Sequence, residues 1–251
     1  MAYFRYLLAV MMICCTLKVQ AEPLRVAAAS NLRYILPALI SQFEQQATHK
    51  IVATYAASGT ITTQIQHGAP FDVFLSADPK YIAHLIELER VASEPVNLPQ
   101  AQLALYTRQN SALKLDDELL HLKRLLASGK LNKVAIANPL HAPYGKAAKQ
   151  ALQQAGLWQP IQPHLLMAEN ATQAVQFSLI STVDAGFVPY GHVIQQQLTS
   201  RGRFIKLAIR LPQQAIVLKQ SVVAQQFLQF IQTEPAKVIF EQYGFSSESE
   251  Q

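Results

Sequence analysis

Cysteine is nearly absent from this 251-residue sequence, since its two cysteines, Cys14 and Cys15, both lie near the amino terminus. We therefore expect no disulfide and no thiolate chemistry in the rest of the chain. Apolar runs long enough to span a membrane are also lacking, which argues against a membrane-spanning helix. The G-x-S-x-G turn that carries the nucleophile in many serine hydrolases is missing as well, so the motifs do not favour an enzyme.

A strong charge of one sign is lacking too. The sequence has 21 Lys and Arg against 16 Asp and Glu, a formal charge of +5, and loss of Arg5 and Lys18 with the first 21 residues lowers it to +3. The basic residues are scattered in short stretches such as HLKRLL and SRGRFIK. We interpret them as a solvated surface and not as a nucleic-acid interface.

The first 21 residues are typical of a signal peptide. Arg5 supplies the positive charge, YLLAVMMICCTL a short apolar run, and Val19–Ala21 the small-residue pattern that precedes cleavage. Neither Cys14 nor Cys15 follows the small residue that lipoprotein processing requires. We therefore expect residues 1–21 to be removed and the rest to be secreted.

Short β-rich runs alternate with segments of helical period from Leu24 onward. Such alternation predicts an α/β protein with largely buried sheets. We expect strands at residues 24–29, 51–56, 71–77, 103–107, 133–137, 165–168, 185–189 and 204–208.

The helical segments carry their own start and stop signals. Asp78 before Pro79 is typical of an N-cap and a first helical position, and Gly68 is typical of a left-handed helix end. Pro37 interrupts the apolar face of residues 32–43 and predicts a kink or a restart. Asp72, like Asp78, is expected to serve only in capping or loop hydrogen bonds. Other helices are expected at residues 60–67, 145–156, 171–181, 222–232 and 235–245, and crossings between two lobes at residues 94–102 and 210–214.

Several junctions between a strand and the next helix share small, polar and uncharged residues. In an α/β sheet these junctions line the ligand crevice, and each helix start presents free N–H groups and a positive dipole end there. A lone Ser or Asn at such a place is usually only a cap. Several of them converging on one point would bind an anion. The four junctions are AAASN with Ser30 and Asn31, YAASGT with Ser58, HAPYGK with Tyr144, and AENAT with Ala171.

The chain resembles the periplasmic molybdate-binding proteins, which are the solute receptors of ABC-type molybdate importers. The resemblance covers residues 24–245 and is most specific in ASGTITTQIQHGAPFDVFLSAD, where a serine-glycine turn, a short helix, GAP and an aspartate-bounded strand follow in order. Five further stretches match the family, namely RVAAASNL, IANPLHAPYGKAAKQAL, AENATQAV, DAGFVPYGHV and FEQYGF.

The resemblance implies a tetrahedral oxyanion held by hydroxyl and main-chain N–H groups without a charged side chain. Ser30 and Ser58 would donate hydroxyl and main-chain hydrogens, with Asn31 beside the first serine. Tyr144 and Ala171 would contribute their main-chain N–H groups. In the last segment the alignment leaves open whether Pro189 or Tyr190 takes the pocket position, and we take Tyr190. Molybdenum would be bound only as molybdate, through these residues and without direct metal ligands or a cofactor.

The resemblance also implies a type II-like fold with two lobes, each a mostly parallel sheet flanked by helices, joined by two crossovers. We expect lobe I at residues 22–103 plus 213–251 and lobe II at residues 104–212. A monomer in the periplasm would bind molybdate, and tungstate as its near-isostere, and deliver it to the membrane subunits of an ABC permease.

Three alternatives stay open at this stage. A receptor for another oxyanion such as sulfate would use the same kind of donors. A receptor for ferric ion would require paired tyrosines and carboxylates as ligands, whereas the tyrosines of PYGK and PYGH have no acidic neighbours. A secreted serine hydrolase would need His and a carboxylate near Ser30 or Ser58. The seven histidines show no ligand spacing with Asp, Glu or Cys, so we expect no metal site.

Overall fold

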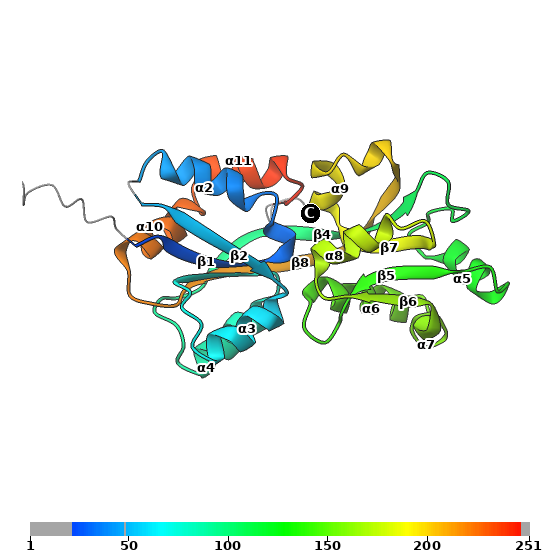
Figure 1. The fold of residues 1–251 in the computed structure, drawn as a ribbon, viewed down its shortest axis with the longest axis horizontal. Helices are drawn as coiled ribbons and strands as arrows, with labels where there is room; N and C mark the ends of the chain where they lie inside the picture. The colour runs from blue at the N-terminus through cyan, green and yellow to red at the C-terminus, as the bar shows by residue number, and fades with distance from the viewer. Residues whose placement is uncertain (1–21, 48, 247–251) are drawn as a thin grey trace, which may run out of the picture.

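The computed structural model describes residues 22–47 and 49–246. The expected signal peptide at residues 1–21 lies outside the described residues, as do Thr48 and residues 247–251. In the described part no helix is long and apolar enough to cross a membrane. Figure 1 shows an elongated molecule with two α/β halves, joined in the middle by the long strands β4 and β8.

The first half is built on three parallel strands. β1 (Leu24–Ala29) lies between β2 (Ile51–Ala56) and β3 (Val73–Ser76), and the far side of β3 pairs antiparallel with β8 (Gly202–Val217). The helices of this half are α2 (Leu36–Glu44), α3 (Ser58–Gln66), α4 (Pro79–Glu87), α10 (Val222–Phe230) and α11 (Glu234–Gln242), and the 3-10 turn η2 (Ser30–Leu32) follows β1.

The second half repeats the arrangement. β5 (Lys133–Ala137) lies parallel between β6 (Leu165–Ala168) and β7 (Val183–Pro189), and β7 pairs antiparallel with β4 (Val96–Arg108). The order across the whole sheet is β2-β1-β3-β8-β4-β7-β5-β6. The helices of this half are α5 (Leu120–Ala127), α6 (Pro143–Gln154), α7 (Trp158–Ile161), α8 (Ala171–Ser178) and α9 (Tyr190–Gln195), with the 3-10 turns η3 (Gln162–His164) and η4 (Leu198–Ser200).

Alternating residues of β1 explain why helices cover both faces of the sheet. Val26 and Ala28 pack in one buried cluster with Leu36 and Leu39 of α2. Ala27 points to the other face, in a cluster with residues of α3 and α4. In Figure 1, α2 and α11 accordingly lie above the strands of the first half and α3 and α4 below them. An apolar residue at every position of a strand is what burial on both faces requires.

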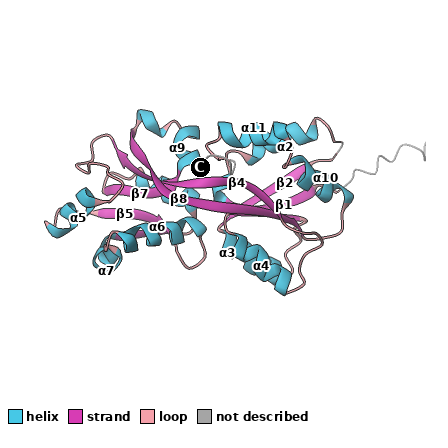
Figure 2. Cartoon of the chain, turned by 180° about the vertical axis from the view of Figure 1, so that it is seen from behind, coloured by secondary structure: helices cyan, strands magenta, loops and turns pink. Residues whose placement is uncertain are grey.

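The two connecting strands pair with each other and are interrupted at the same level. Figure 2 shows β4 and β8 side by side between the halves. Their register shifts between Leu98 and Ala101, where Pro99 and Gln100 of β4 face Pro212 of β8. Gln100 pairs there with Ser246 of the carboxyl-terminal segment. Proline has no N–H to donate to a ladder, which explains why both prolines lie where the register breaks.

Most of the expected elements are confirmed. The strands at residues 24–29, 51–56, 133–137 and 165–168 have the expected bounds, and the chain restarts as α2 after η2, around Pro37. Asp78 caps α4 by accepting a hydrogen bond from the Lys80 N–H, and Asp72 accepts one from the Arg25 N–H. Gly68 has the expected left-handed backbone after α3, with a φ of 85°. The expected crossings at residues 94–102 and 210–214 lie largely inside β4 and β8, and α5 and α9 were not predicted.

Gly145 allows α6 to begin directly against the end of β5. A Cβ at this position would lie 2.2 Å from the main-chain oxygen of Ala137, which is far inside van der Waals contact. A methyl group therefore fits between the first turn of α6 and the end of β5 only if the loop between them moves.

We expect Gly145→Ala to lower the free energy of unfolding by about 1–3 kcal/mol, because the added methyl group has to displace backbone atoms. Denaturant titration of the secreted form measures this effect. The control is Gly156→Asn, at a helix end with a φ of 69° and no atom within 4 Å of the added Cβ, where asparagine tolerates the backbone. Equal stabilities of Gly145→Ala and the unsubstituted protein would contradict the prediction.

Candidate functional site

The carboxyl ends of the parallel strands in both halves face the middle of the molecule. β1 and β2 end at Ala29 and Ala56, and the site residues Ser30 and Ser58 begin the next elements. β5 and β6 end at Ala137 and Ala168, ahead of α6 and α8, whose starts hold Tyr144 and Ala171. Figure 1 shows α8 beside the end of β1, between the two halves. The strand ends thus bring the four predicted junctions to one region, as in other α/β ligand sites.

Ser30 connects the two halves directly. Its Oγ accepts a hydrogen bond of 3.1 Å from the Ala171 N–H, and its carbonyl oxygen accepts one of 3.0 Å from the Thr172 hydroxyl. Both Ser30 and Ala171 are buried, with 4% of each residue exposed. Within the described residues the Ser30 hydroxyl donates no hydrogen bond. Because its oxygen already accepts one, its hydrogen is available to an acceptor in the site.

Ser58 has the same arrangement on a second element. It is fully buried, and its Oγ accepts a hydrogen bond of 3.1 Å from the Ala77 N–H. No hydrogen bond donated by this hydroxyl is found among residues 22–47 and 49–246. The next residue, Gly59, donates its N–H to the carbonyl of His141, 2.9 Å away in the other half. A Cβ on Gly59 would lie 2.8 Å from that oxygen, so glycine is needed for the halves to touch here.

Alanine precedes the two helices that begin at this region. Ala57 is the N-cap of α3 and Ala142 is the N-cap of α6, and a methyl group accepts no hydrogen bond from the first turn. Alanine is one of the least favourable N-cap residues, at a cost of about 1 kcal/mol relative to Ser or Asp. The choice leaves first-turn N–H groups, Tyr144 N–H among them, without a side-chain acceptor at the positive end of each helix.

The side chains of Tyr144 and Asn31 meet behind these helix starts. The Tyr144 hydroxyl and Asn31 Oδ1 are buried and have no hydrogen-bond partner among residues 22–47 and 49–246. Burial raises the pKa of the Tyr144 hydroxyl well above its usual range, and the neighbouring Asn31 side chain opposes this rise. The hydroxyl therefore stays protonated at every physiological pH and remains a hydrogen-bond donor.

The recorded contacts of Tyr190 are with residues other than the five remaining candidates. Tyr190 is the first residue of α9, and its half-buried ring packs against Phe204 with a centroid distance of 5.7 Å. The Lys206 Nζ lies 5.1 Å from the centre of the same ring. No hydrogen bond joins Tyr190 to Ser30, Asn31, Ser58, Tyr144 or Ala171 in the part of the chain that is described. A ligand contact of Tyr190 stays a prediction.

Two functional neighbours were missed by reasoning from the sequence. Gln213 of β8 accepts a hydrogen bond of 2.8 Å from Asn31 Nδ2, and His192 of α9 bonds the Asn31 carbonyl at 3.0 Å. Both side chains are buried, with 1% of each residue exposed. They lie 182 and 161 positions from Asn31 in the sequence, so no local pattern marks them.

The charged side chains nearest to the site are engaged elsewhere. The Arg33 guanidinium lies over the Tyr55 ring, 5.3 Å from its centre. Lys146 Nζ donates to the Tyr81 hydroxyl at 2.8 Å and lies 3.6 Å from a carboxylate oxygen of Asp78. Within the described ranges no charged side chain forms a hydrogen bond with Ser30, Asn31, Ser58, Tyr144 or Ala171. The donors of the site are therefore neutral.

The geometry does not activate either serine as a nucleophile. No histidine forms a hydrogen bond with the hydroxyl of Ser30 or Ser58 in the described part of the chain. The two nearby histidines bond main-chain carbonyls instead, His192 that of Asn31 and His141 that of Glu169. A serine without a base is a poor nucleophile at neutral pH. The residues described contain no group of three or more His, Cys, Asp or Glu side chains able to hold a metal ion.

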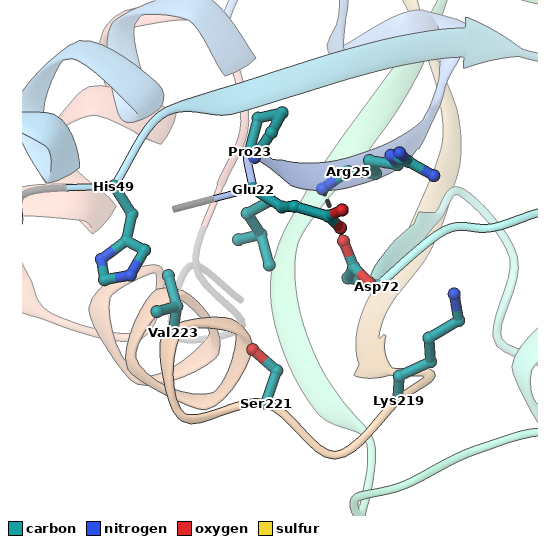
Figure 3. Close-up of a pocket in the computed structure, with 9 residues that line it drawn as sticks. Glu22, Pro23, Arg25, His49, Asp72, Lys219, Ser221 and Val223 are labelled. Atoms are coloured by element: carbon teal, nitrogen blue, oxygen red, sulfur yellow. Dashed lines mark hydrogen bonds between the residues drawn. The ribbon is translucent and has the colours of Figure 1, made fainter. Parts of the chain in front are cut away.

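An open cavity of about 340 Å³ lies at the opposite end of β1. Figure 3 shows its mixed lining, in which Glu22, Asp72, Arg25 and Lys219 surround an opening toward His49 and Ser221. Asp72 accepts the Arg25 N–H there at 2.7 Å. This cavity lies at the amino-terminal ends of the strands and contains both signs of charge, so we do not assign the ligand to it.

His192 makes the folding stability dependent on pH. Burial lowers the pKa of His192 to about 4, and the positive charge of Arg33 lowers it further. Hydrogen bonds to the main chain of Asn31 and Ser30 partly oppose this shift. The unfolded chain, with an ordinary histidine, binds more protons below pH ~6.5, so stability falls as pH drops from there toward 4. The loss reaches roughly 3 kcal/mol at pH 4. Denaturant titrations from pH 7.5 to 4 should show a shallower loss of stability for His192→Gln. His164→Gln, at a partly exposed position, should keep the pH dependence of the unsubstituted protein. Equal pH dependence of all three proteins would contradict this expectation.

Comparison with known proteins gives concordant matches over nearly the whole chain. The molybdate-binding protein ModA of Rhodobacter capsulatus is 30% identical over 226 residues, with 88% of this chain and 87% of the relative covered. ModA of Azotobacter vinelandii is 29% identical over 235 residues, with 90% of each covered. The solved structure of an Azotobacter vinelandii periplasmic molybdate-binding protein superposes with a TM-score of 0.80 at 28% identity, covering 90% of this chain and all of that one.

More distant structures share the fold. The structure of the sulfate-binding protein SubI of Mycobacterium tuberculosis superposes with a TM-score of 0.76 at 17% identity. The match covers 91% of this chain and 88% of the SubI chain. The model of the family described as bacterial extracellular solute-binding protein matches residues 24–246. This family consists of binding proteins and not of enzymes. Two α/β halves, neutral donors between them and this match together show that the chain belongs to the bacterial extracellular solute-binding proteins.

Proposed function

We propose that this protein binds molybdate, and also its near-isostere tungstate, and delivers the anion to an ABC-type permease. One observation carries the proposal: two buried serine hydroxyls from separate elements each accept a main-chain N–H and donate no hydrogen bond within the described chain. Each presents its hydrogen to the region between the halves. Fully deprotonated molybdate has only acceptor oxygens, so it matches a set of donors.

We assign the contacts as follows. Ser30 and Ser58 donate their hydroxyl hydrogens, Tyr144 its main-chain N–H at the start of α6, and Asn31 lies beside the first serine. The Ala171 N–H, now donated to Ser30 Oγ, is shared with an anion oxygen or transferred to it. Tyr190 is included as a contact from the start of α9. Helix starts without a side-chain cap supply the remaining donors.

Neutral donors meet the energetic demand of a dianion. An ion that leaves water loses its hydration energy, and several aligned hydrogen bonds have to replace it. Hydroxyl and amide donors do so without a titrating partner, so affinity should change little between neutral and mildly alkaline pH. A carboxylate in the site would repel the ion, and we find none bonded to the candidate residues described.

Selectivity follows from protonation state and bond length. Phosphate carries a proton near neutral pH and needs an acceptor in the site, which disfavours it. Sulfate carries the same charge as molybdate on shorter bonds, so in a rigid site some donors stay out of reach. Tungstate is nearly isosteric with molybdate. The relatives named as molybdate-binding proteins favour the same ligand for this chain.

The biological setting belongs to the same proposal. Residues 1–21 act as a signal peptide, and the mature protein works as a monomer in the periplasm. Lobe I comprises residues 22–103 plus 213–251 and lobe II residues 104–212. Closure of the lobes brings Ser30 and Ser58 against Tyr144 and Ala171, so binding and closure form one equilibrium.

The serine hydroxyls provide the first test. We expect the protein to bind molybdate and tungstate tightly and sulfate at least ~100-fold more weakly, or roughly 2.7 kcal/mol. Combined Ser30→Ala and Ser58→Ala should weaken molybdate binding by at least ~100-fold, because each hydrogen bond to a charged group contributes roughly 1.5–3 kcal/mol. Isothermal titration with molybdate, tungstate, sulfate and ferric citrate measures both.

The control is a double variant of exposed serines, Ser128→Ala with Ser200→Ala, whose hydroxyls bond nearby carbonyls. It should bind like the unsubstituted protein. Equal affinity for sulfate and molybdate would contradict the selectivity, and binding that survives the loss of both site serines would contradict the assignment of the donors.

Lys146 provides a second test, because it joins α6 in one half to α4 in the other. Its bonds to Tyr81 and Asp78 form only when the halves are together. We expect Lys146→Met to release molybdate faster and so to raise the Kd by roughly 3–10-fold. A partly exposed ion pair contributes about 1 kcal/mol or less, and the hydrogen bond to Tyr81 adds to this contribution. Stopped-flow release kinetics measure this.

Lys149→Met is the matched control for Lys146→Met. Lys149 lies on the same helix and its Nζ lies over the Trp158 ring of its own half, so its replacement removes the same charge without touching the other half. A release rate that rises equally in both variants would show that net charge, and not closure, is responsible.

A further inference from the structure

Asn31 is held on two sides by buried residues that are not among the proposed anion donors. Its side-chain Nδ2 donates to Gln213 Oε1 at 2.8 Å, and its carbonyl oxygen accepts a hydrogen bond of 3.0 Å from His192 Nε2. Only 2% of Asn31 is exposed, so neither bond competes with bulk water. Buried amides of this kind require partners, and these partners determine their orientation.

The orientation of the Asn31 amide follows from the partner of Gln213. Gln213 Nε2 donates to the Pro99 carbonyl at 3.3 Å, and a carbonyl can only accept. Gln213 must therefore present its oxygen to Asn31, and Asn31 must present its NH₂ group to Gln213. Asn31 Oδ1 is thereby directed away from Gln213, and it has no hydrogen-bond partner among the described residues.

His192 fixes the main chain of the same residue. Because the Asn31 carbonyl only accepts, His192 carries its hydrogen on Nε2, and its Nδ1 has no partner in the described structure. The edge-to-face contact of its ring with Tyr34, with centroids 4.7 Å apart, holds the imidazole in place. The turn η2 has no side-chain cap, so the bond from His192 is one of the few that fix the segment carrying Ser30.

We propose that Gln213 and His192 are positioning residues of the anion site, which act through Asn31 to hold the Ser30–Asn31 turn in its binding geometry. The inference rests on the proposed function. Gln213 and Pro99 belong to the strands that connect the halves, and His192 belongs to the second half. The turn is therefore fixed only when both halves and the connecting strands are in their present arrangement, which makes the donor geometry depend on closure.

The test replaces Gln213 by methionine, which keeps the shape and removes both hydrogen bonds. We expect Gln213→Met to weaken molybdate binding by at least ~10-fold and to lower the ratio of molybdate to sulfate affinity. Isothermal titration with both anions measures this, alongside thermal unfolding of the ligand-free protein. The matched control is Gln214→Met, the next residue of β8, whose side chain bonds Asn97.

A double-mutant cycle with Asn31→Ala separates positioning from a structural role. If Gln213 acts through Asn31, Gln213→Met has no further effect on molybdate affinity once Asn31 is alanine, because the two changes remove the same interaction. A purely structural role predicts that the two losses add and that the ratio of affinities does not change. Additive losses or an unchanged ratio would overturn the inference.

The conservative variant tests His192. His192→Gln places an amide donor near the position of Nε2 and should retain molybdate affinity within ~3-fold, whereas His192→Leu should lose at least ~10-fold. Equal affinity of these two variants would overturn the role of His192. Should Gln213→Met fail to fold, Gln213→Asn takes its place, because its shorter amide cannot reach both Asn31 and the Pro99 carbonyl, and the same loss of affinity is expected.

The outcomes distinguish this inference from the proposed function. An unsubstituted protein that binds molybdate, with Gln213→Met unchanged, overturns the positioning role and leaves the proposed function intact. An unsubstituted protein that binds none of molybdate, tungstate and sulfate overturns both.

Discussion

A doubly charged anion leaves water only where hydrogen-bond donors replace its hydration shell, and this requirement explains the central features of the molecule. Ser30 and Ser58 are buried, and their hydroxyl groups donate no hydrogen bond within the described residues. Alanine occupies the N-caps of α3 and α6, where Ser or Asp would stabilise the helix better. Such choices reduce stability locally and preserve donors for a ligand. The apolar strands on both sides hold the donors in place.

Contacts between the halves and contacts of the site involve the same atoms. Ser30 Oγ accepts the Ala171 N–H, and Gly59 beside Ser58 donates to His141 of the opposite half. A ligand that prefers this arrangement shifts the population toward it by its difference in affinity between the closed and open states. Lys146, bonded to Tyr81 at the edge of the same interface, adds stability to the closed state without contacting the donors. In the proposed function, affinity and closure are therefore coupled through a small number of hydrogen bonds.

Periodicity and capping signals were sufficient to predict the elements that flank the site. The strands before Ser30 and Ser58 and the capped helix after Asp78 follow from local residues, and so does the restart after Pro37. The long strands β4 and β8 were underestimated, because Pro99 and Pro212 interrupt patterns that the tertiary pairing restores on both sides. The bonds of Gln213 and His192 to Asn31 join residues far apart in the chain, and no spacing rule connects such residues.

The paired prolines of the connecting strands have a mechanical consequence. Neither Pro99 nor Pro212 has an N–H, so at that level of β4 and β8 the ladder contains fewer bonds that a bend has to break. A pair of strands bends most easily where it has few inter-strand hydrogen bonds. The axis of any rotation between the halves should therefore pass near this point. Gln213, one residue after Pro212, would lie near that axis and would change its position little in such a rotation.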